Sequence, residues 1–183
     1  MPRPAPRLDD PGTFAQVFLN SYDPLGQPAD RLADGAAARA FLPGWVRLPR
    51  GTDWAALAEE LRSWRDRLRV ATRTTVVEGE ARALARLLRQ GLGGIAWQAS
   101  LEAGPLRFRP APGQPAAAQV LGLALQGLAE ELEACGAARL RLCQASPCEE
   151  LFFDRSKRGA QHFCGKRCAN RVHVARFRER QRA

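Results

Sequence analysis

Before residue 138, the chain is dominated by apolar residues at helical spacing. The longest such segment begins at Asp53, and its apolar face carries side chains three and four residues apart: Trp54, Leu57, Ala58, Leu61, Trp64 and Leu68. Thr75 and Glu78 fit a capping box, which predicts the start of a second helix with its own apolar face as far as Gly91: Val77, Ala81, Leu84, Ala85 and Leu88. A third long helix is predicted over 116–135. We expect these helices to share one core.

Shorter elements accompany the long helices. A capping box at 13–16 predicts a short helix that ends near Asn20, and Asp34 is placed to cap another helix. Alternating residues at 95–101 and 106–109 predict a β-hairpin. Asn20 has two interpretations. It either caps the helix or pins the next loop through hydrogen bonds, or it contacts a ligand of the N-terminal domain.

The segment 139–183 departs from this helical pattern and contains four of the five cysteines. Cys143 and Cys148 form one close pair, and Cys164 and Cys168 form another. Two such pairs can hold one ion, and four thiolates suit tetrahedral Zn²⁺. The sequence therefore predicts one structural zinc. Cys135 lies outside this set, where a buried core thiol is expected.

The residues around the cysteines predict the rest of this module. A strand is expected at 150–154, a turn at 155–159, a return strand at 160–163, and a helix from about Gly165 to the end. This order predicts a treble-clef-like zinc module. The alternatives are two disulfides or four thiols that are close only by chance. Disulfides require an oxidising compartment, and the segment that follows Met1 has no apolar signal sequence. We therefore expect a cytoplasmic protein.

Positive charge is concentrated in the same module. The chain has 28 Lys and Arg against 19 Asp and Glu, a formal net charge of +9, and nearly all of the excess follows residue 138. A basic module beside a near-neutral domain is typical of nucleic-acid binding. We expect contacts from the basic turn and the terminal helix: Arg155, Lys157, Arg158, Lys166, Arg167, Asn170, Arg171, Arg176 and Arg178.

Asn170 and Arg171 follow the last metal ligand directly, so the metal would fix their backbone. Side chains held in this way can read a base edge. The alternative is that both are internal and bond the carbonyl groups of the cysteine turn. The distal arginines at the end of the helix would only position it against phosphates.

These residues resemble the CGNR zinc finger, a C-terminal module of bacterial proteins. The resemblance rests on Phe152-Phe-Asp154, the basic turn, Phe163-Cys164 and Cys168-Ala-Asn-Arg171, where Ala169 replaces glycine. In that family the finger usually follows an N-terminal ABATE domain, in proteins described as stress-induced transcription regulators. Phe18-Leu-Asn-Ser21 resembles the opening Phe-x-Asn-Thr signature of that domain. The resemblance implies a transcription regulator.

The sequence as a whole predicts an α+β protein. A mainly helical ABATE-like domain with a small β-hairpin spans 1–138, and the treble-clef-like zinc finger spans 139–183. We expect the helical domain to fold without the finger. No catalytic set stands out, and both histidines, His162 and His173, lie in the finger, so an enzyme is not expected.

We expect the protein to bind DNA as a transcription regulator, with one Zn²⁺ and no membrane partner. The N-terminal domain would sense a small-molecule effector or form a homodimer. The alternative is a finger that binds RNA or an acidic protein, because zinc modules of this shape serve several roles.

Overall fold

The computed structural model describes residues 11–101 and 106–182. Its elements confirm a mainly helical α+β protein with two small antiparallel hairpins, β1–β2 and β3–β4. In chain order they are α1 (Pro11–Leu19), α2 (Gly35–Phe41), α3 (Trp54–Glu78), α4 (Arg82–Gly93), β1 (Trp97–Ser100), β2 (Arg107–Pro110), α5 (Ala116–Cys135), the 3₁₀ turn η1 (Ala137–Arg139), β3 (Leu140–Leu142), β4 (Leu151–Phe153) and α6 (Lys166–Arg182).

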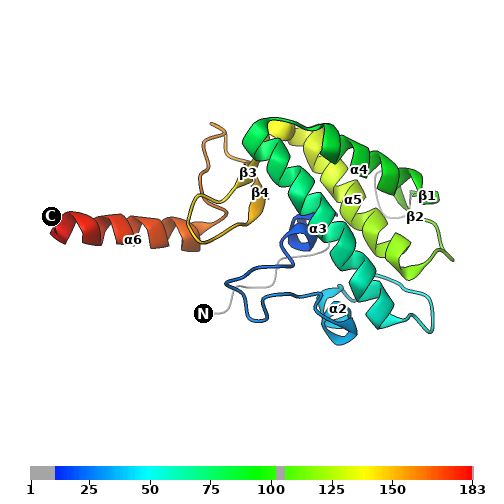
Figure 1. The fold of residues 1–183 in the computed structure, drawn as a ribbon. Helices are drawn as coiled ribbons and strands as arrows, with labels where there is room; N and C mark the ends of the chain where they lie inside the picture. Colours follow the sequence, from blue (N-terminus) through cyan, green and yellow to red (C-terminus); the bar gives the residue numbers. More distant parts are fainter. Residues whose placement is uncertain (1–10, 102–105, 183) are drawn as a thin grey trace.

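The core of the molecule lies among the helices before residue 136. α5 packs against α1, α3 and α4, and α2 packs against α3 (Figure 1). The largest fully buried side chains of these helices include Phe14, Phe18, Leu61, Leu68, Leu84, Val120, Leu125 and Leu128. Among the residues that the structure describes, no helix is both long enough and apolar enough to cross a membrane.

α3 is longer than the sequence pattern predicts, because the capping box at Thr75 does not begin a helix. Thr75 lies in the last turn of α3, where its hydroxyl donates to the carbonyl of Ala71 at 2.9 Å. Gly79 (φ 71°) then ends the helix in the left-handed conformation. Val77, expected in the core, is 67% exposed. A Thr-x-x-Glu pattern therefore marked a helix end, and α4 begins at Arg82.

The two tryptophans of α3 are half-buried rather than enclosed in the core. The ring of Trp64 lies beneath the Arg67 guanidinium, whose central carbon is 4.2 Å from the ring centroid. The aliphatic positions of the same stripe are fully buried, as the helical spacing predicts: Leu57, Ala58, Leu61 and Leu68. Both tryptophans therefore cover the edge of the core.

A line of arginines along α3 holds the chain between α1 and α2 in place. Arg65 is only 3% exposed, and its guanidinium donates to both carboxylate oxygens of Asp30, at 2.6 and 3.2 Å. Arg69, one turn later, donates to the carbonyl of Leu19 at 2.8 Å. A buried guanidinium must be paired to be tolerated. These bonds therefore fix the end of α1 against α3.

The β3–β4 hairpin connects the helical core to the cysteine module. Its register pairs Leu140 with Phe153 and Arg141 with Phe152. Successive residues of a strand point to opposite faces. Phe153 and Leu140 accordingly pack in the helical core, whereas Phe152 packs in a second cluster with Cys143 and Cys168.

This pairing corrects the predicted hairpin, in which 150–154 would pair with 160–163. The partner of β4 is β3, and 160–163 contains no strand. This segment contacts the cysteine turn instead, through a hydrogen bond from the Gln144 amide to the His162 carbonyl at 2.9 Å. The sequence pattern favoured the strand that follows β4 in the chain. The actual partner, β3, precedes β4 and is separated from it by Cys143 and Cys148.

Asn20, at the end of α1, is hydrogen-bonded to β4 through both the nitrogen and the oxygen of its side-chain amide. Its Nδ2 donates to the Leu151 carbonyl at 2.7 Å, and its Oδ1 accepts from the Leu151 amide at 2.9 Å. Nδ2 also donates to the carbonyl of Gln16 at 3.0 Å. Asn20 thus has the pinning role that the sequence allowed, but its partner is the distant finger strand rather than the next loop.

Two ion pairs also join the helical residues to the finger. Arg73 of α3 lies 3.3 Å from Glu149, and Arg155 pairs with Glu131 of α5. Together with the shared hairpin, these contacts make the packing continuous across residue 138. Independent folding of the helical domain stays a prediction, and two residues of its core, Leu140 and Phe153, come from β3 and β4.

We predict that Asn20→Ala lowers the free energy of unfolding by about 2 kcal/mol, since it leaves both backbone groups of Leu151 without their partner. Urea unfolding of the zinc-loaded chain measures this change. Asn170→Ala is the matched control, because Asn170 is exposed on α6. Equal midpoints for Asn20→Ala and the unmodified protein would show that this bond pair contributes nothing.

Candidate metal centre and basic surface

Four cysteine sulfurs meet at one point of the finger. The Sγ atoms of Cys143, Cys148, Cys164 and Cys168 all lie within 4.8 Å of one another. Two of the separations are 3.9 Å (Cys148 to Cys164) and 3.6 Å (Cys164 to Cys168). Tetrahedral zinc with Zn–S bonds of about 2.3 Å requires sulfurs about 3.8 Å apart. The four sulfurs therefore fit one zinc ion, as predicted.

The same distances exclude the disulfide alternative. A disulfide requires sulfurs about 2.05 Å apart. All five cysteines are unpaired, and Cys135 is outside the cluster, half-buried at the end of α5. The prediction of one structural zinc, with Cys135 excluded, is confirmed for these residues.

Two local turns bring the ligands together. Cys143 directly follows β3, and a tight turn returns the chain to Cys148, whose amide donates to the Ala145 carbonyl at 2.7 Å. Cys164 and Cys168 lie on either side of the start of α6, so one helical turn separates them. The amide of Cys164 donates to the Sγ of Cys143 at 3.4 Å. The helix N-terminus, with its partial positive charge, faces the sulfur cluster.

The thiols differ in how readily they ionise without a cation. Burial opposes ionisation of Cys143, but hydrogen bonds from the amides of Cys164 and Ala145 lower its pKa below the usual value. Burial and the neighbouring Cys143 sulfur raise the pKa of Cys148 to about 12. Burial and Glu150 likewise raise the pKa of Cys164. A bound divalent cation would let all four thiols ionise, because its charge offsets the burial and the neighbouring negative groups, and coordinated thiols lose their protons.

Arg171 closes the finger beside the metal ligands. Its guanidinium donates to the Ala145 carbonyl at 2.7 Å and lies 3.9 Å from the Sγ of Cys168. Arg171 therefore bonds a carbonyl group of the cysteine turn, as the alternative for this residue expected, while the residue as a whole is exposed. A positive charge here offsets the net negative charge of four thiolates around Zn²⁺. Base reading by Arg171 stays a prediction, and its guanidinium is engaged within the finger.

Asp154 shapes the basic turn that follows β4. Its two carboxylate oxygens accept from the amides of Ser156 and Gln161, each at 2.9 Å. Hydrogen bonds from Ser156, strengthened by the Gln161 amide and by Arg139, hold the pKa of Asp154 at about 2. Gly159 supplies the expected positive φ of 63°. No role was predicted for Asp154 from the sequence, although an Asp side chain commonly accepts from the backbone amide two residues later in such a turn.

The predicted nucleic-acid residues lie on two exposed surfaces. The turn carries Arg155, Lys157 and Arg158, of which Arg155 is paired with Glu131 of α5. The other surface is α6, which projects from the body of the molecule with the C-terminus at its tip (Figure 1). All the predicted contacts on this helix are exposed: Lys166, Arg167, Asn170, Arg171, Arg176 and Arg178.

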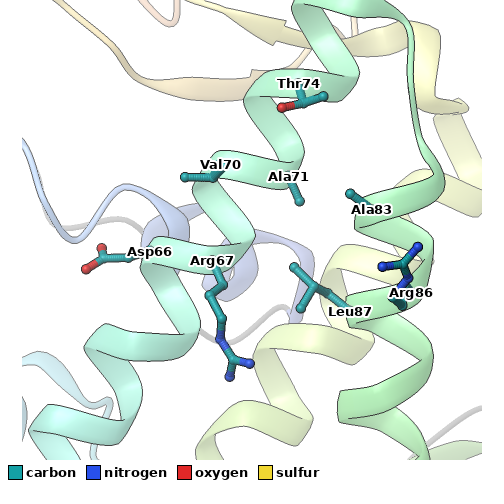
Figure 2. Close-up of a pocket in the computed structure, with 8 residues that line it drawn as sticks. All are labelled: Asp66, Arg67, Val70, Ala71, Thr74, Ala83, Arg86 and Leu87. Carbon is teal, nitrogen blue, oxygen red and sulfur yellow. The ribbon is translucent and has the colours of Figure 1, made fainter.

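The helical domain has a concave surface of its own between α3 and α4. This groove has a volume of about 520 Å³. The apolar side chains of Val70, Ala71 and Leu87 line it, and Arg67 and Arg86 extend from the two helices beside it (Figure 2). No pattern in the sequence marked it, because Val70 lies outside the apolar stripe of α3.

Comparison with known families identifies the finger from the same residues. Residues 139–181 match the CGNR zinc finger. The CGNR match contains the four cysteines, the basic turn and all but the last residue of α6. Residues 1–138 lie outside it, so an ABATE domain stays a prediction. A search of curated proteins found no match to the chain.

We predict one zinc per chain. Cys135→Ser should retain it and Cys164→Ser should lose it, because Cys164 belongs to the cluster and Cys135 does not. Metal analysis of the purified variants tests this. The two substitutions are chemically identical, so the comparison isolates the position of the thiol. Loss of zinc from Cys135→Ser, or full retention by Cys164→Ser, would contradict the ligand set.

We predict that Arg171→Ala lowers the apparent affinity for zinc by roughly 10- to 100-fold. Competition with a chelator measures this affinity. The substitution removes the bond to Ala145 and the charge beside Cys168. Arg178→Ala, on an exposed part of the same helix, is the control and should release zinc normally. Unchanged release from Arg171→Ala would remove Arg171 from the zinc centre.

Proposed function

We propose that the CGNR-type finger binds DNA through α6 and that the protein regulates transcription. The observation that carries this proposal is the position of α6, which carries the metal ligand Cys168 in its first turn and is exposed after Val172. After Val172, every described residue of the helix is exposed, including four arginines and only one acidic residue, Glu179. A helix of this diameter fits the major groove of B-DNA, which is about 12 Å wide.

Several features support nucleic acid over a role confined to the fold. Isolated helices shorter than about 12–15 residues are marginal in water. The zinc centre fixes the start of α6, but its distal half has no partner in the described part of the chain. Repulsion among its arginines is relieved when phosphates neutralise them. Duplex RNA is a weaker candidate, since the narrow major groove of A-form helices excludes an α-helix.

The helical domain would contribute the regulatory part of this function. The α3–α4 groove offers an apolar floor beside two arginines, which suits a small apolar molecule with a negative charge. α3 also reaches the finger through Arg73 and Glu149. An effector that shifts α3 would therefore act on the part of the protein from which α6 projects.

We predict that the zinc-loaded chain binds duplex DNA with a strong salt dependence. If α6 and the basic turn neutralise about five phosphates, log K against log salt falls with a slope of roughly −4 to −5. Fluorescence anisotropy with a labelled duplex measures the slope. Arg178→Ala should reduce its magnitude by about 0.9, because one phosphate contact is lost.

Arg89→Ala is the control for this prediction, since it removes one exposed arginine from α4 and leaves the finger intact. Its slope should equal that of the unmodified protein. No measurable binding to DNA, or the same loss from Arg89→Ala as from Arg178→Ala, would contradict the proposed function. Tighter binding to an RNA of equal length would favour the alternative of an RNA-binding module.

A further inference from the structure

The exposed side of α6 carries a stripe that is not basic. Four residues form it, spaced four, three and four apart, so they share one face of the helix: Asn170, Val174, Phe177 and Gln181. Cys168 and Val172 pack in the zinc cluster and lie on the opposite side of the helix. Val174 is 47% exposed and Phe177 is 55% exposed. The stripe therefore faces away from the finger.

Val174 and Phe177 belong to neither of the two hydrophobic clusters of the described residues. The apolar residues that the finger needs are already packed around the cysteines, including Phe152, Phe163 and Val172. A helix that only contacted phosphates would need positive charge and nothing apolar. Two large apolar side chains between two amides therefore form a part of the helix surface that the described fold does not cover.

The composition of the stripe matches the chemistry of A·T base pairs in the major groove. Asn and Gln form paired hydrogen bonds with N6 and N7 of adenine, and apolar side chains contact the methyl group of thymine. Asn170 and Gln181 are the two amides, at the ends of the stripe, and Val174 and Phe177 are the apolar residues between them.

The charges of α6 are arranged on both sides of this stripe. By helical spacing, Arg167 and Arg178 lie along one edge, and Lys166 and Arg180 lie along the other. Phosphates form the two walls of a groove, so this arrangement places charge at the walls and uncharged side chains at the floor. From Asn170 to Gln181 the helix rises about 16 Å, which is roughly five base pairs.

We propose that the stripe of Asn170, Val174, Phe177 and Gln181 reads A·T base pairs in the DNA major groove. The amides recognise adenine and the apolar residues recognise thymine methyl groups, over a site of about five base pairs. This inference rests on the proposed function, because it assigns sequence preference to a helix already proposed to bind DNA.

The test begins with selection of duplexes from a random pool by the full-length, zinc-loaded chain. The enriched duplex should contain A·T pairs. It is then made with uracil in place of thymine, which removes the methyl groups and keeps base pairing. The unmodified protein should bind the uracil duplex roughly fourfold more weakly for each methyl group contacted. Val174→Ala and Phe177→Ala should each show a smaller difference between the two duplexes.

The amides are tested by the ratio of affinities for the enriched and a scrambled duplex. Asn170→Ala should lower this ratio by roughly 5- to 100-fold, the range expected for one paired contact to a base. Arg178→Ala is the control, and it should weaken both duplexes equally. All variants replace exposed residues with alanine, a strong helix former. Zinc content and helical signal confirm that each variant is folded.

The outcomes separate this inference from the function on which it rests. Salt-dependent binding without sequence preference would overturn the inference alone. An equal loss from Asn170→Ala on both duplexes would also overturn it, as would a uracil duplex that the unmodified protein binds as tightly as the thymine duplex. If Phe177→Ala converts a dimer to a monomer and leaves the selected sequence unchanged, the stripe is a contact between chains and the inference fails. No binding to any duplex would overturn both.

Discussion

The β3–β4 hairpin must satisfy two cores at once. Phe153 and Leu140 complete the helical core, and Phe152, the neighbour of Phe153, packs against the cysteines on the other face. Each strand has only three residues, and so short a hairpin is not stable alone. The helical core covers one face of the hairpin, and we expect the zinc centre to stabilise the other, since Cys143 directly follows β3 and Cys168 lies in the first turn of α6. The metal therefore orders a hairpin on which the helical core also depends.

Other contacts converge on the same hairpin and fix how the finger sits on the helices. Asn20 bonds both backbone groups of Leu151 from the end of α1, and Arg69 fixes that end of α1 to α3. The finger is thus held from one side by the helices and from the other by the metal. α6 is held at its start by Cys168, Arg171 and Val172 and is exposed beyond Val172, so its direction is set by the zinc module and not by contacts along its distal half.

The sequence predicted the parts of the structure that depend on local spacing. The cysteine pairs identified the zinc ligands, because each pair lies within one turn, and the apolar stripe of α3 identified core residues such as Leu61. Long-range pairing was not predictable in this way. Asn20 and Leu151 are 131 residues apart, and nothing near Asn20 indicates its partner. The capping box at Thr75 failed for a related reason, since the left-handed Gly79 ended the helix there.

Hydrogen exchange with and without a zinc chelator tests the central claim that the metal supports the helical core through the shared hairpin. We predict that chelation lowers protection in β3 and β4 and, together with them, in the parts of α1 and α3 that pack on the hairpin. Loss of protection confined to residues 139–182, with α1 and α3 unchanged, would contradict it. That result would mean that the helical domain is complete without Leu140 and Phe153.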